Sequence, residues 1–154
     1  MAKNDGQSGR AWALLLARWL LGLIFVMAGF WKVFTLGPLE HASGMFVEAY
    51  ADTFLPTWSL WLTGTTIPAI ELIAGVALLI GWRVRAALLA LGAVLLIVTF
   101  GHLLAQPLYS FTQHVIPRAA LVFLLLWLPR SDDRFTLESW LAGRRKQDPS
   151  ASAS

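Results

Sequence analysis

The sequence of 154 residues contains no cysteine. This absence excludes disulfides, thiolate metal sites and thiol redox chemistry within the chain, so a redox role would need a redox group from outside it. Charged residues are also scarce, at 14% of the chain, whereas 57% of the residues are hydrophobic and the mean hydropathy is +0.64. A soluble domain of this size carries more charge. The composition therefore predicts an integral membrane protein.

The sequence also lacks the short motifs of several enzyme classes. We find no nucleotide-binding loop, no zinc motif and no nucleophile elbow. The formal net charge of +3 comes from basic residues at the ends of the predicted helices. Such a distribution indicates contact with the lipid bilayer and not a nucleic-acid partner. We predict no metal site and no cofactor held by this chain alone.

Long apolar runs predict an all-α integral membrane protein built as a four-transmembrane-helix bundle. The predicted helices cover about 13–34, 60–82, 86–105 and 111–128, within a membrane domain of residues 13–129. Residues 1–12 have the polar composition of a disordered cytoplasmic tail, and 130–154 that of a cytoplasmic amphipathic segment with a disordered end. In the first outer loop Phe46, Tyr50 and Phe54 recur every four residues. This spacing predicts a short amphipathic helix on the membrane surface.

Basic residues give the predicted orientation. Every lysine and arginine that flanks a span falls on one side of this topology, and the two loops on the opposite side contain no lysine or arginine. The flanking residues are Lys3, Arg10, Arg83, Arg85, Arg130, Arg134, Arg144, Arg145 and Lys146. The positive-inside rule then places both termini in the cytoplasm.

Glu71 and Arg118 are ionisable residues in the middle of predicted spans. Counting at 1.5 Å per residue from each span centre puts both within about 3 Å of the membrane midplane. A lone charge at that depth costs roughly 3 kcal/mol, so the matching depths predict that the two form an ion pair. A structural pair that fixes helix register and a ligand or proton site are both open interpretations.

Further polar residues lie toward the predicted outer face: Lys32, His102 and His114. Pro68 and Pro117 lie just outside Glu71 and Arg118, and each leaves a helical carbonyl free, that of Gly64 and that of Gln113. Together these groups predict a small hydrated pocket in the outer half of the bundle.

Each of these residues also has a structural interpretation. Lys32 has the position of a lysine that extends to the interface, and the two histidines sit at span ends where they are easily hydrated, which disfavours haem. Arg18 has no acid at its depth and is expected to reach the interface or a carbonyl. Gly22 and Gly29, seven residues apart on one helix face, favour close helix packing.

Two stretches resemble the DoxX family of small bacterial membrane proteins. The first is Arg18 to Lys32 (RWLLGLIFVMAGFWK), with its Arg, Gly-x-x-Phe and Gly-x-x-Lys elements, and the second is Glu71 to Ala87 (ELIAGVALLIGWRVRAA). The resemblance covers about residues 13–129 and implies a four-helix bundle in a bacterial inner membrane. It also implies that Arg18, Lys32 and Glu71 are the polar membrane residues of the family.

Some DoxX-like proteins deliver electrons to the quinone pool, so the resemblance implies a membrane subunit of a quinone-linked oxidoreductase or redox complex. The chain would then be an accessory subunit at most, acting with other membrane or membrane-associated subunits and with quinone as the candidate cofactor. The alternatives are a non-catalytic membrane anchor or scaffold, in which the polar residues only set helix register, and a small-solute carrier. Four helices leave little room for the alternating access that a carrier needs.

Overall fold

The computed structural model describes residues 2–106, 115–129 and 133–147, and every regular element in these ranges is helical. The elements are α1 (Ala2–Phe30), η1 (Trp31–Leu36), α2 (Pro38–Ala42), η2 (Ser43–Glu48), α3 (Thr57–Ile80), α4 (Val84–Ala105), α5 (Val115–Trp127) and α6 (Leu137–Gln147). The two η elements are short π-helices.

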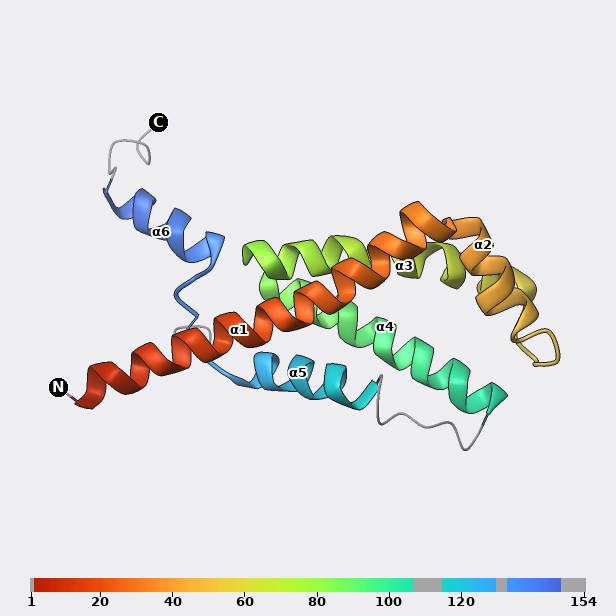
Figure 1. Ribbon diagram of the computed structural model, residues 1–154, viewed down its shortest axis with the longest axis horizontal. Helices are drawn as coiled ribbons and strands as arrows, with labels where there is room; N and C mark the ends of the chain where they lie inside the picture. Colours follow the sequence, from red (N-terminus) through yellow and green to blue (C-terminus); the bar gives the residue numbers. More distant parts are fainter. Residues whose placement is uncertain (1, 107–114, 130–132, 148–154) are drawn as a thin grey trace.

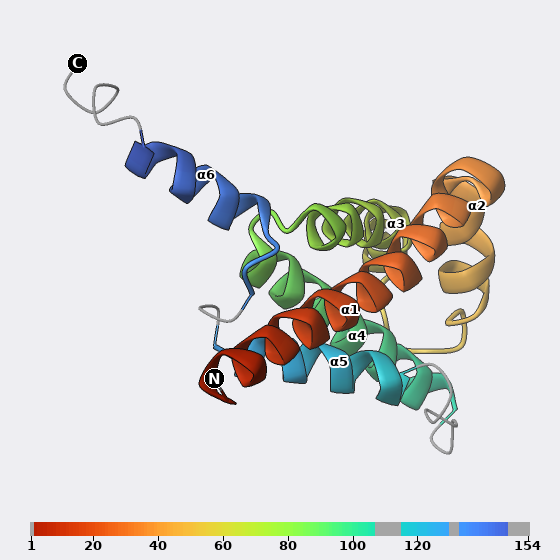
Figure 2. The ribbon, with the colours of Figure 1, turned by 60° about the vertical axis from the view of Figure 1, so that its left-hand side comes forward.

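Helices α1, α3, α4 and α5 form a bundle in which each packs against two others. The contacts run from α1 to α3, from α3 to α4, from α4 to α5 and from α5 back to α1 (Figure 1). Helix α2 and η2 pack on the first part of α3 at one end of the bundle, which we call the α2 end. The start of α1 and helix α6 lie at the opposite end, which we call the terminal end (Figure 2).

Three segments are long and apolar enough to cross a membrane: Ser8–Leu36, Thr57–Ile80 and Val84–Ala105. They confirm the first three predicted spans. The fourth is described as the shorter apolar helix α5 of 13 residues, and residues 111–114 of the predicted span lie outside the described ranges. The cytoplasmic location of both termini stays a prediction.

The centre of the bundle is apolar and closely packed. Leu21 and Phe25 of α1 meet Leu78 of α3 and Leu88 and Leu91 of α4, all at most 2% exposed. Many large apolar side chains point outward instead, including Leu20, Leu96 and Phe123. An apolar exterior around an apolar core is the pattern of a helix bundle that lipid surrounds.

Glycines allow α1 and α3 to approach each other closely. A Cβ atom on Gly29 would lie 2.6 Å from the backbone nitrogen of Leu72, and one on Gly75 would lie 2.8 Å from that of Val26. A Cβ on Gly22 would likewise meet the carbonyl oxygen of Gly75 at 3.1 Å. The predicted packing role of Gly22 and Gly29 is confirmed, and backbone contact replaces side-chain contact along this seam.

Two local predictions differ from the structure. The predicted disordered tail is helical from Ala2, because adding residues to an existing helix requires no new nucleation step. The first connection does contain short helices, α2 and η2, but of the three spaced aromatic residues only Phe46 lies in one of them. Both helices pack on α3, where Ala42 and Gly64 are small enough for close contact: a Cβ on Gly64 would lie 2.6 Å from the Cα of Ala42.

The α1–α3 seam gives a stability prediction. Gly29→Ala inserts a methyl group against the backbone of Leu72 and forces the helices apart, so we expect about 1–3 kcal/mol of destabilisation, measured as a lower thermal unfolding midpoint in detergent. Gly9→Ala is the matched control, because nothing lies within 4 Å of its Cβ and alanine favours the helix. It should leave the midpoint unchanged or raise it; equal losses in both variants would contradict the proposed seam.

Candidate functional site

An ion pair joins the first and third long helices. Lys32 of η1 places its Nζ 2.7 Å from Oε2 of Glu71 on α3. The Glu71 side chain is 8% exposed and that of Lys32 20%, so the pair is mostly enclosed by the bundle. Lys32 follows α1 in a π-helix, an element that occurs often at functional sites.

The predicted pair of Glu71 with Arg118 is wrong. The Arg118 guanidinium lies over the ring of Phe25, with its Cζ atom 5.9 Å from the ring centroid, a cation–π contact. Helix α5, which carries Arg118, packs on α1 and α4, whereas Glu71 belongs to the seam between α1 and α3. The estimated depth of a residue gives its position along the bundle axis, but it does not say which neighbouring helix its side chain faces. Lys32 therefore reaches inward to Glu71 instead of extending to the interface.

His41 is a third member of this region, and the sequence prediction missed it. It is 2% exposed, and its Nδ1 lies 2.7 Å from the carbonyl oxygen of Gly64. Pro68 has no N–H to give that oxygen, so the Nδ1–H of His41 donates to the carbonyl that the proline leaves free. The one available signal was this free carbonyl, which needs a donor from another segment.

The environment of His41 favours its neutral form. Burial is the largest effect and lowers the pKa of the imidazole below its ordinary value of 6.5. The hydrogen bond with Gly64 and the charge of Glu71 oppose this lowering of the pKa, whereas the charge of Lys32 adds to it. Because burial is the largest of these effects, the ring is held neutral with its proton on Nδ1. His41, Lys32 and Glu71 thus interact electrostatically, and we call them the Lys–Glu–His site.

The other predicted residues lie elsewhere or outside the described ranges. His102 is partly exposed near the end of α4, and Pro117 is exposed on α5. His114 and Gln113 lie outside the described residues, so the predicted proximity of the two histidines is not tested. Within the described ranges no group of three or more His, Asp or Glu side chains gathers as a metal site.

Arg18 makes a separate polar cluster at the terminal end. It is completely buried, and Nη1 donates to the carbonyls of Leu78 and Leu79, while Nη2 donates to that of Phe135 at 2.6 Å. The predicted carbonyl partner is confirmed. The sequence did not reveal the acid: Nε of Arg18 lies 3.4 Å from Oδ2 of Asp133, a residue in the connection after α5.

The Arg18 cluster holds segments of the fold together. Leu78 and Leu79 belong to the last turn of α3, which is capped by Gly81 with a positive φ of 73°. The N–H of Gly81 donates to the carbonyl of Leu78, and Arg18 gives both carbonyls a further donor. Burial raises the pKa of the Asp133 carboxyl, and the charge of Arg18 opposes that rise. The guanidinium therefore joins α1, the end of α3 and the segment before α6.

The Lys–Glu–His site has a different character, because it holds groups that can exchange protons. A carboxylate, an ammonium group and a neutral imidazole lie beside a stretch of α3 whose helical hydrogen bonding Pro68 interrupts. Opening the ion pair would free the Glu71 carboxylate to accept a hydrogen bond from a ligand. This arrangement can bind a polar group or pass a proton.

The sequence model of the family described as "Methylamine utilisation protein MauE" matches residues 10–115 of the chain. The matched range contains Arg18 and all three residues of the Lys–Glu–His site. No curated protein and no solved structure matches the chain. The resemblance to the DoxX family is thereby confirmed only at the level of a related family of small membrane proteins.

The ion pair predicts strong coupling between its two residues. Lys32→Met and Glu71→Gln should each destabilise the protein, because each leaves the other group without its partner, whereas the double variant should lose less than the sum. We expect a coupling of about 0.5–3 kcal/mol from thermal or denaturant unfolding in detergent. The control cycle pairs Glu71→Gln with Arg118→Gln and should be additive. Coupling in the control cycle alone would contradict the assignment of Lys32 as the partner.

His41 predicts a pH dependence of stability. Its pKa is lower in the folded chain than in the unfolded one, so its favourable contribution is complete above about pH 6.5 and is lost as the pH falls through and below that value. His41→Asn keeps a donor near Gly64 and does not titrate. Between about pH 8 and pH 5 the unfolding midpoint should therefore fall more in the wild type than in this variant. Identical pH profiles would show that His41 is not buried in its neutral form.

Proposed function

The chain belongs to the MauE family, and from this membership we propose that it is a membrane component of a methylamine-utilisation redox system. In this role it acts as an accessory subunit, serving the assembly or operation of the oxidoreductase that the system contains, methylamine dehydrogenase. We further propose that the Lys–Glu–His site exchanges protons for this system. Other membrane or membrane-associated subunits are its expected partners.

The observation that supports this function best is the enclosed ion pair of Lys32 and Glu71 next to a buried neutral histidine. A pair that served packing alone would be replaceable by apolar residues, often without loss of stability. An intramembrane carboxylate with a nearby imidazole is instead the combination that proton relays use. The family match includes all three residues, so the site lies in the part of the chain that defines the family.

The three residues have complementary parts in proton exchange. Lys32 holds Glu71 in the closed ion pair. When a polar group takes the place of Lys32, the Glu71 carboxylate can accept a hydrogen bond and then a proton from that group. His41, with Nδ1–H held by the Gly64 carbonyl, presents Nε2 as an acceptor that can pass the proton onward.

Quinone is the redox group that fits this donor set. The ammonium group of Lys32 is suited to a quinone carbonyl oxygen, and Glu71 and Nε2 of His41 are suited to a quinol hydroxyl. When bound, a quinone would supply the electron-accepting chemistry that a chain without cysteine lacks. The chain's own residues would orient the head group and hold its proton.

Arg18 favours a second function, that of a membrane anchor or scaffold. Its hydrogen bonds make the segment before α6 part of the bundle, as expected of a chain that holds a larger complex in place. Under that alternative the Lys–Glu–His site would only fix how α1 lies against α3. Loss of Glu71 would then reduce the amount of assembled protein, not the activity of what remains.

Glu71→Gln separates the two functions. In a strain that lacks this chain and is complemented with the variant, we expect growth on methylamine and methylamine dehydrogenase activity to fall roughly 100-fold per assembled protein, as for loss of a group that transfers protons. Because the variant is also expected to be less stable, the amount of protein in the membrane is measured by immunoblot and the activity is divided by it.

Glu48→Gln is the matched control, because Glu48 is exposed on η2. It should retain full activity. Full activity of Glu71→Gln at a normal protein level would contradict the proton-exchange function, and a loss of activity in proportion to the protein level would favour the anchor.

A further inference from the structure

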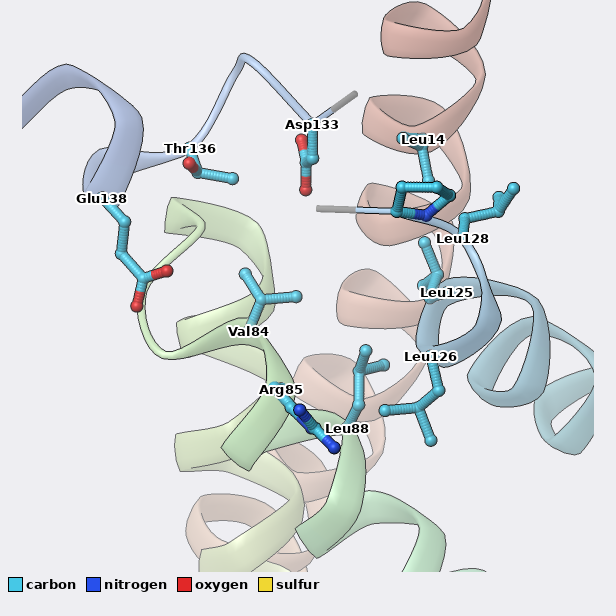
Figure 3. A pocket seen from close by; sticks show the side chains of 11 residues that line it. Leu14, Val84, Arg85, Leu88, Leu125, Leu126, Leu128, Asp133, Thr136 and Glu138 are labelled. Carbon is cyan, nitrogen blue, oxygen red and sulfur yellow. The ribbon is translucent and has the colours of Figure 1, made fainter. Parts of the chain in front are cut away.

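A pocket of about 290 Å³ lies at the terminal end of the bundle, away from the Lys–Glu–His site. It opens between the side of α1 at Leu14, the start of α4, the end of α5 and the segment that leads into α6 (Figure 3). Its volume is close to the lower end of those of small-molecule pockets. Nothing in the proposed function uses it.

The lining of the pocket is divided between apolar and polar side chains. The apolar part consists of residues from α1, from the start of α4 and from the end of α5 and the residues after it: Leu14, Val84, Leu88, Leu125, Leu126, Leu128 and Pro129. The polar part consists of Arg85 on α4 with Asp133, Thr136 and Glu138 beside and on α6. In Figure 3 Arg85 lies beside Leu88, on the far side of the pocket from Asp133 and Thr136. Such a lining suits an amphiphile, not a fully polar or fully apolar ligand.

Its location matches the boundary between lipid tails and head groups. Val84 begins α4 and Leu128 directly follows α5, so both helices end at the pocket. Trp127 is the last residue of α5, Trp82 lies between α3 and α4, and the Trp12 ring lies 4.7 Å from that of Phe135 in the segment before α6; all three tryptophans are exposed. Tryptophan is enriched at the membrane interface, so the pocket lies where phospholipid head groups are found.

The charges of the pocket select a type of head group. Among the described residues of its lining, Arg85 is basic, and Asp133 and Glu138 are acidic. Oδ1 of Asp133 is buried and has no hydrogen-bond partner, and its other oxygen is 3.4 Å from Arg18. Glu138 accepts a hydrogen bond from the backbone N–H of Arg83 through Oε1. The lining thus combines one phosphate-binding cation with two carboxylates that suit an ammonium group.

We propose that this pocket binds an ethanolamine phospholipid of the surrounding leaflet. Arg85 binds the phosphate, the primary ammonium group donates to Glu138 and Asp133, and the leucines contact the first part of the acyl chains. The lining supplies a partner for each part of such a lipid: leucines for the acyl chain, Arg85 for the phosphate, and Asp133 and Glu138 for the amine. An anionic lipid without an amine would meet two carboxylates and bind less well.

The test uses the full-length chain purified in a mild detergent and titrated by calorimetry with short-chain lipids. Phosphatidylethanolamine should bind about tenfold more tightly than phosphatidylcholine with the same chains, because a quaternary ammonium group has no N–H to donate. It should also bind about tenfold more tightly than phosphatidylglycerol, which has no amine. Equal affinity for all three, or tightest binding of phosphatidylglycerol, would overturn the proposal.

Variants show whether the binding occurs in this pocket. Glu138→Gln keeps an oxygen that can accept from Arg83, and should weaken phosphatidylethanolamine binding about tenfold while leaving phosphatidylcholine binding unchanged. Arg85→Gln should weaken the binding of both lipids. Glu48→Gln, at the α2 end, should change neither. If Glu138→Gln binds phosphatidylethanolamine as the wild type does, the lipid is bound elsewhere and the proposal is wrong. Asp133 is not substituted, because its contact with the buried Arg18 makes its loss a folding defect.

Discussion

The close approach of α1 and α3 is the constraint on which the site depends. Gly22, Gly29 and Gly75 remove the side chains that would separate the two backbones. At this short distance, the lysine that follows α1 can reach across to Glu71 on α3. In lipid no water is available to stabilise either charge, so the approach of the helices decides whether the charges can exist there at all. The ion pair of Lys32 and Glu71 therefore depends on the close packing of α1 against α3.

Much of the membrane architecture could be predicted from the sequence. Apolar length identifies the three long helices, and the spacing of Gly22 and Gly29 identifies the face of α1 that packs closely. The partner of Glu71 could not be predicted by counting residues. Depth ranks groups along the membrane normal, and Arg118 matched Glu71 on that scale, but the rotation of each helix about its axis decides which groups meet. Lys32 starts nearer the α2 end of the bundle and reaches Glu71 with its long side chain.

Residues from connections were the hardest to predict. His41 lies in α2 and Asp133 in the segment between α5 and α6, and neither has the helical periodicity from which depth is estimated. Both meet a group that the sequence had already marked as incomplete. Pro68 left the Gly64 carbonyl without a donor, and Arg18 was a buried cation without an acid. Unsatisfied groups inside the membrane thus predict that a partner exists, although they do not predict which residue supplies it.

The hydrogen bonds of Arg18 also fix the order in which the protein can be completed. Its guanidinium needs the carbonyls at the end of α3 and the carbonyl of Phe135, which lies 117 residues later in the chain. While the ribosome is still making the second half of the protein, the first helix must enter the membrane with that charge only partly satisfied. Residues synthesised near the end of translation then complete its burial. The first transmembrane helix is thus among the last to reach its final environment. In a chain terminated before residue 133, Arg18 would stay in the membrane without Asp133 and Phe135 as partners.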